Sequence, residues 1–177
     1  MEQPTITIAS FARFRKEFLD EIGMAVQLEF HCKVSVKEVY LDLSVFFDPG
    51  RRQYNGDALL RMVDSMDFAG STKVIALFNV DLFIPILTYI FGQAQLGGRT
   101  GIASTFRLSN KHYGIEDGDK LLTDRFKKEV IHELGHQFGL IHCHTPICVM
   151  RSSTYVEDID QKEEGLCSKC YEMLDMK

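Results

Sequence analysis

The chain has 177 residues, close to the length of one ordinary domain. Hydrophobic residues make up 45% of it and charged residues 25%, a normal globular balance that allows a sizeable core. The formal net charge of -5 argues against a nucleic-acid-binding protein, because such proteins usually carry a basic face.

Signals for secretion or membrane insertion are not found in the sequence. Residues 1–20 lack the basic start and the unbroken apolar stretch of a signal peptide. The longest apolar run, residues 82–91, is too short to span a bilayer and contains Pro85. We therefore expect a monomeric cytoplasmic protein with no membrane partner and no nucleic-acid partner.

Strands and helices alternate along the first two-thirds of the chain. Alternating or β-branched apolar residues predict strands at 5–9, 34–45, 73–80 and 101–109. Apolar residues at helical spacing predict one short helix over 11–22, with Ser10 as its cap, and another over 58–66. This alternation predicts an α/β fold around one mixed sheet.

The longest predicted helix covers roughly residues 119–139. Its core stripe repeats every four residues, at Leu122, Phe126, Val130, Leu134 and Phe138. After Gly139 the composition changes to Cys, His, Pro and Ser. We expect a small irregular subdomain there, organised by metal and ending in a short helix from about residue 168.

A first metal site is predicted at the end of this helix. His132 and His136 are four residues apart, which places both imidazoles on one helix face, one turn apart, as two adjacent ligands require. Glu133 lies beside the first histidine, where a carboxylate can act as general base on a metal-bound water without binding the metal.

The third ligand is expected to be His142. On a continued helix it would point away from His136, so the helix must stop between the two. Gly139 allows this, because glycine accepts the left-handed conformation of a helix C-terminus. Three histidines and a water form the open zinc site typical of catalysis. The alternative is a later carboxylate as third ligand, from Glu157 or Glu163.

A second metal site is predicted from the cysteines. Cys143 and Cys148 are separated by four residues, and Cys167 and Cys170 form a C-x-x-C pair. Two such pairs are typical of a closed structural zinc site with four thiolates. Positive charges at Arg151, Lys162 and Lys169 would offset its negative charge. The alternative is a redox pair made by Cys167 and Cys170.

His142 and Cys143 are neighbours but would bind different metals. Consecutive side chains of an extended backbone point to opposite sides, so this is physically sensible. The second zinc would then brace the segment that presents the third histidine. His144 is left without an assigned role.

These residues resemble the archaemetzincins, a branch of the metzincin metallopeptidases. The likeness is carried by His132, Glu133, His136, Gly139, His142, Cys143, Cys148, Met150, Cys167 and Cys170. Residues 51–60 and 81–87 also resemble family segments, so the likeness covers most of the chain. In several other metzincin branches a Tyr follows two residues after the equivalent of Met150. Here Ser152 stands at that position, and Tyr155 is the closest candidate to hydrogen-bond an oxyanion.

The resemblance implies a metzincin-like mixed β-sheet with an active-site helix and a small zinc-organised C-terminal subdomain. It implies one metallopeptidase domain over 1–177, with a cleft between an upper part (1–139) and a lower part (140–177). It also implies two zinc ions, one catalytic and one structural, and Met150 in a tight turn beneath the histidines.

The expected function is that of a zinc-dependent peptidase acting on peptide or protein substrates. Zinc lowers the pKa of its bound water, and Glu133 takes the proton. Residues 101–109 are expected to offer an exposed edge strand to the substrate, unless that strand is internal to the sheet. The alternative function is a peptide-binding or regulatory metalloprotein with the same fold and little or no turnover.

Overall fold

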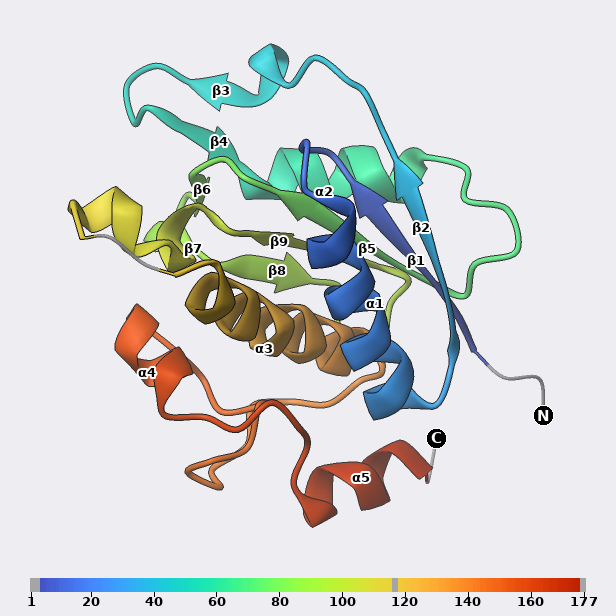
Figure 1. The fold of residues 1–177 in the computed structure, drawn as a ribbon. Helices are drawn as coiled ribbons and strands as arrows, with labels where there is room; N and C mark the ends of the chain where they lie inside the picture. Colours follow the sequence, from blue (N-terminus) through green and yellow to red (C-terminus); the bar gives the residue numbers. More distant parts are fainter. Residues whose placement is uncertain (1–3, 116–117, 176–177) are drawn as a thin grey trace.

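The computed structural model describes residues 4–115 and 118–175 and contains two mixed sheets (Figure 1). The larger sheet has five strands, in the order β2 (Lys33–Glu38), β1 (Thr5–Ser10), β5 (Lys73–Phe78), β9 (Thr100–Ser104) and β8 (Gly92–Ala94). Its strands are parallel except for β8, which runs antiparallel to β9.

A smaller sheet extends the upper side of the molecule. Its four strands lie in the order β3 (Phe47–Asp48), β4 (Gln53–Asn55), β6 (Leu82–Ile84) and β7 (Leu87–Ile90). Each has only two to four residues, too few to produce a clear alternating pattern in the sequence. The α/β class is confirmed, but the expectation of a single mixed sheet was wrong.

Helices cover both faces of the five-stranded sheet. In Figure 1, α1 (Lys16–Phe30) and α3 (Asp119–Gln137) lie on one face and α2 (Gly56–Ser65) on the other. Successive side chains of β5 point to opposite faces of the sheet. Ile75 and Leu77 therefore pack in the core under α1 and α3. Val74, Ala76 and Phe78 pack in the core under α2. With both faces covered, β5 is buried along most of its length.

Most predicted elements are found, with shifted ends. The helix predicted over 11–22 is α1, but it begins only at Lys16 and continues to Phe30, and the predicted cap, Ser10, belongs to β1. Phe11 reaches the core from outside the helix, stacking on Phe78 at 4.9 Å between ring centroids. Its apolar character therefore reflects core packing in an irregular segment and not helical periodicity.

The strand predicted over 101–109 is internal. β9 pairs with β5 on one side and with β8 on the other, and it ends at Ser104. A 3-10 helix, Phe106–Leu108, follows it; two others cover Ser44–Phe46 and Asn110–Tyr113. The edge of the sheet on this side is therefore β8, a strand of three residues that the sequence analysis did not predict.

Residues after α3 pack beneath it (Figure 1). This region contains α4 (Val156–Asp160) and α5 (Ser168–Asp175), joined by irregular chain. The segment around Val149 is held by backbone hydrogen bonds to residues 163–165: Val149 N–H donates to Gly165 O at 3.1 Å, and Glu163 N–H donates to Ile147 O at 2.8 Å. Cys148, Val149 and Met150 thereby join the core under α1 and α3.

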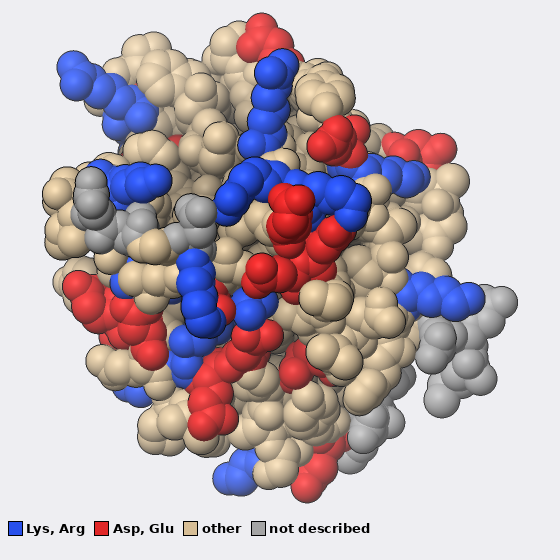
Figure 2. All heavy atoms as spheres, in the orientation of Figure 1, with Lys and Arg blue, Asp and Glu red and all other residues tan. Residues whose placement is uncertain are grey.

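Charged side chains of both signs lie intermingled on the face seen in Figure 2. Ion pairs join some of them, such as Lys127 with Asp124 and with Glu164. Among the described helices, none is both long and apolar enough to cross a membrane.

Candidate metallopeptidase site

The end of α3 sets the position of all three histidines. The helix carries His132 and His136 one turn apart and ends at Gln137. Gly139 has a φ of 84°, in the left-handed region, and its N–H donates to His136 O at 2.8 Å. A side chain with a Cβ is strained in that conformation, so glycine is the residue suited to end the helix here. The chain then turns and brings His142 back to the other two histidines.

The three imidazoles converge on one point. One ring nitrogen from each lies within 4.8 Å of the others. The Nε2 atoms of His132 and His136 are 3.1 Å apart, and the ring of His142 lies 5.3 Å and 4.9 Å from theirs, centroid to centroid. Two nitrogens bound to one tetrahedral zinc at 2.0–2.1 Å would be about 3.3 Å apart, so the spacing suits this ion.

Backbone carbonyls fix the orientation of two of the rings. Val149 O lies 2.8 Å from Nδ1 of His132, and Leu140 O lies 2.8 Å from Nδ1 of His136. A carbonyl can only accept, so each Nδ1 carries the proton and each Nε2 has a free lone pair. Burial lowers the pKa of all three imidazoles, that of His132 well below its usual range. Neutral rings with aligned lone pairs are what a zinc ion requires.

Glu133 lies beside these histidines but is not part of their cluster. Its side chain lines the same cavity and is only 5% exposed. Burial raises its pKa well above the usual range, and the nearby carboxylate of Glu129, one helical turn away, adds to this. A carboxyl group in such surroundings holds a proton readily, which suits general acid–base chemistry.

The histidines open into a cleft of about 590 Å³. Its lining includes residues 87–94, which contain β7 and β8, and residues 152–155. Tyr89 connects these two segments, because its hydroxyl donates to Thr154 O at 2.9 Å. Tyr155 also lines the cleft and is 63% exposed, and its proposed contact with an oxyanion stays a prediction.

Met150 packs directly against the histidine-bearing helix. It is fully buried, and a Cβ placed on Gly135 would lie 2.3 Å from its Sδ atom. Gly135 is therefore needed for the close approach of the 148–151 turn to α3. This position lies between His132 and His136 in sequence, and no sequence pattern indicated its role.

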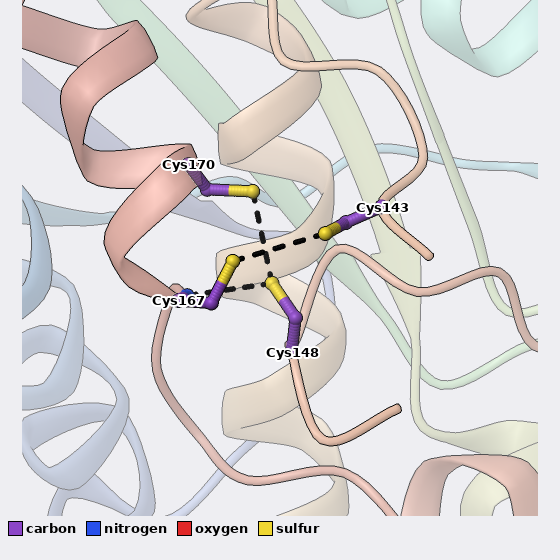
Figure 3. A group of neighbouring side chains, drawn as sticks. All are labelled: Cys143, Cys148, Cys167 and Cys170. Atoms are coloured by element: carbon purple, nitrogen blue, oxygen red, sulfur yellow. Dashed lines mark hydrogen bonds between the residues drawn. The ribbon is translucent and has the colours of Figure 1, made fainter. Parts of the chain in front are cut away.

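Four cysteine sulfurs form a second cluster (Figure 3). The Sγ atoms of Cys143 and Cys167 are 3.8 Å apart, and those of Cys148 and Cys170 are 3.7 Å apart. Tetrahedral zinc with Zn–S bonds of about 2.3 Å places sulfurs about 3.8 Å apart, so this donor set also fits zinc. Convergence of all four sulfurs favours a metal over a redox pair formed by two of them.

Backbone N–H groups favour the thiolate at Cys167, whereas burial raises the pKa of Cys148 and of Cys170. The N–H groups of Thr145 and Cys167 lie 3.4 Å from the sulfurs of Cys143 and Cys148. For Cys167, burial acts to raise the pKa, but the backbone N–H of Cys170 and further hydrogen bonds lower it to about 6. A thiolate at neutral pH is the form that binds metal.

The remaining candidates lie outside both clusters. His144 is exposed and belongs to neither set of converging donors, and Glu157 and Glu163 are not in the histidine cluster. Lys162 was expected to offset the charge of the thiolates. It lines the histidine cleft together with Glu129. In the sequence, Glu129 is marked only by its place one helical turn before Glu133. No sequence pattern indicates that Lys162 lies in the cleft.

Comparison with known proteins identifies the family. The family model described as Peptidase family M54 matches residues 39–176 of this chain. The chain belongs to this peptidase family. The archaemetzincin of Haloquadratum walsbyi is 34% identical over 157 residues, which cover 87% of this chain and 90% of the relative. That of Methanocaldococcus jannaschii is 31% identical, covering 90% of this chain and 82% of the relative.

Solved structures agree with this assignment. The crystal structure of archaemetzincin from Methanopyrus kandleri superposes with a TM-score of 0.86 at 30% identity, over 98% of this chain and 94% of that one. The archaemetzincin of Archaeoglobus fulgidus, complexed with malonate, gives 0.80 at 28% identity, over 96% and 99%. The resemblance to the archaemetzincins is confirmed, and the M54 chain is a zinc-dependent peptidase, hence a hydrolase.

Replacing Gly135 by alanine tests the contact with Met150. The added Cβ should displace the buried Met150 side chain and destabilise the protein by about 1–3 kcal/mol, as overpacking does. Thermal unfolding measures the loss. The control is Gly23→Ala in α1, where the Cβ would make an ordinary 3.7 Å contact with Val34. That variant should melt at or above the parent temperature, because alanine favours a helix. Equal melting of the two variants would contradict the contact.

Proposed function

We propose that this M54 chain hydrolyses peptide bonds at a zinc ion held by His132, His136 and His142, with Glu133 as general base. The observation that carries the proposal is the convergence of three oriented imidazoles beside a buried carboxyl group in an open cleft. Three protein ligands leave one position open, as in catalytic zinc sites.

Each protein group has a separate task in this mechanism. When bound, zinc supplies the Lewis acidity that activates a water molecule and polarises the peptide carbonyl. Glu133 accepts the proton of the attacking water and delivers it to the leaving amine. Its burial keeps competing water away from the carboxyl group, which strengthens its interaction with the reacting atoms.

The substrate is proposed to pair with β8 and not with β9. β8 is the edge strand, and all three of its residues line the cleft. An extended peptide can add to such an edge through backbone hydrogen bonds, with its side chains in pockets on either side. This places the scissile bond between the strand and the histidines.

The cysteine cluster is proposed to hold a second, structural zinc ion. Cys143 directly follows His142, so the thiolate centre fixes the backbone that presents the third histidine. On this proposal residues 1–177 form one domain, with 1–139 above the cleft and 140–177 below it. Cytoplasmic location, a monomeric state, and the absence of nucleic-acid and membrane partners stay predictions from the sequence.

Cys170→Ser tests the structural role of the thiolate centre. Cys170 is 3% exposed, and its loss removes one of four ligands from a region with little secondary structure. Apparent binding energies of structural zinc reach about 10 kcal/mol in zinc-finger peptides and contribute to folding, so the melting temperature should fall clearly.

The matched control is Cys32→Ser, which changes a buried cysteine outside the cluster. A chelator should lower the melting temperature of the parent and of the control by the same amount. It should have much less effect on Cys170→Ser, which has already lost that metal. A Cys170→Ser protein that responds to the chelator like the parent would rule out the structural role.

Glu133→Gln tests the enzyme against the alternative of a binding protein. Glutamine keeps the size of the side chain but cannot accept the proton, so kcat on a peptide library should fall by about 10²–10⁴. Zinc content and the melting temperature should stay at the parent values, because Glu133 is not a ligand. Glu157→Gln, at an exposed position near the cleft, should retain both activity and zinc.

Two results would speak against the proposal. Equal cleavage by the parent and Glu133→Gln would remove Glu133 from the chemistry. A zinc-loaded parent that cleaves nothing across a broad library would favour a peptide-binding or regulatory protein.

A further inference from the structure

Lys162 is a buried cation at the floor of the cleft. It follows α4 and is only 5% exposed, yet it lines the same cavity as the histidines. Among the described residues that line this cavity, it is the only lysine or arginine. Its Nζ atom donates to Val149 O at 3.2 Å.

The same carbonyl oxygen accepts a hydrogen bond from His132. The distance from Val149 O to His132 Nδ1 is 2.8 Å. A carbonyl oxygen has two lone pairs, so it can serve both donors. The ammonium of Lys162 therefore contacts the atom that orients a proposed zinc ligand, and such outer partners of a ligand control its orientation and basicity.

The peptide of Val149 is held on its other side by the chain next to Lys162. Val149 N–H donates to Gly165 O, and Glu163 N–H donates to Ile147 O. These bonds place the start of the Lys162 side chain at a fixed position relative to the carbonyl. No comparable cation lies at Leu140 O, the carbonyl that orients His136, in the interactions of the described residues.

Two carboxyl groups on α3 line the same cavity as this cation. Glu129 and Glu133 are both 5% exposed and lie one helical turn apart. Burial lowers the pKa of Lys162, while the charges of Glu129 and Glu133 act to raise it. When both carboxyl groups are ionised they repel each other, and a cation in the same cavity offsets this repulsion. β8 adds a steric limit, because a Cβ on Gly92 would lie 2.8 Å from Glu133 Cγ and 2.9 Å from Glu129 Oε1.

We propose that Lys162 is a positioning residue for the peptidase centre, which holds Val149 O against His132 and keeps Glu129 and Glu133 in place by its charge. The catalytic part of this inference rests on the proposed function of Glu133. The part that concerns His132 does not depend on peptidase activity.

Lys162→Met tests both parts, because methionine keeps an unbranched side chain of similar volume and removes its charge and donors. In the zinc-loaded protein, the NMR signal of the His132 Nδ1 proton should shift, because its acceptor Val149 O loses a second donor. The signal of the His136 Nδ1 proton, bonded to Leu140 O, should not move and is the internal control. Lys162→Arg, which keeps the charge and the donors, should return the His132 signal toward its parent position.

Turnover gives the second measurement. Lys162→Met should lower kcat by about 10–100-fold, the usual effect of losing a partner behind a metal ligand, with KM changed by less than about threefold. Adding Glu129→Gln removes one of the two carboxylates in the cavity, so the double variant should be more active than Lys162→Met alone. A side chain that only fills space would not show this rescue.

Each outcome decides the inference. An unmoved His132 signal with kcat within twofold of the parent would overturn it, and so would equal shifts of both histidine signals. If Lys162→Met does not fold, the double variant with Glu129→Gln should fold, since it restores the charge balance. If the double variant also fails to fold, Lys162 serves the fold alone and the inference is overturned. A shifted His132 signal in a protein whose parent shows no cleavage would refute the peptidase proposal and leave the positioning of His132 intact.

Discussion

The end of helix α3 is the constraint on which the site depends. Two of the three imidazoles share a helix face only because the helix continues through His136. The third can join them only because the helix stops within the next turn. Gly139 meets both conditions through its left-handed conformation, at a φ of 84°. A longer helix would carry His142 away and leave only two imidazoles together.

The segment after this stop connects the two proposed metal centres. His142 belongs to the histidine cluster and Cys143 to the sulfur cluster, although they are adjacent. The chain returns through Cys148 to Val149, whose carbonyl contacts both His132 and Lys162, and to Met150, which packs on Gly135. These few residues contribute to the core, hold the ring of His132 and bring His142 to the cleft. Changes in the cysteines are therefore expected to reach the histidines through the backbone.

Local patterns in the sequence predicted a large part of this arrangement. The histidine spacing, Gly139 and the cysteine pairs lie close together along the chain, so helical geometry and ligand spacing alone were enough to group them. The buried strand β5 and the long helix α3 were also predicted, because each has many residues with a regular period.

What the sequence could not predict depends on contacts between distant segments. β8 has three residues, and its place at the sheet edge follows from pairing with β9. Lys162 reaches the cleft only through the packing of the chain after α4, and Gly135 matters only because Met150 meets it. The error at Phe11 has the same origin, since apolar residues that enter the core from an irregular segment imitate a helix.

Zinc-edge anomalous diffraction from crystals of the zinc-loaded protein tests the central claim most directly. We predict two peaks. One should lie at bonding distance from the Nε2 atoms of His132, His136 and His142. The other should lie at bonding distance from the sulfurs of Cys143, Cys148, Cys167 and Cys170. A single peak, or a first-site zinc bound by Glu157 or Glu163 with His142 turned away, would contradict it.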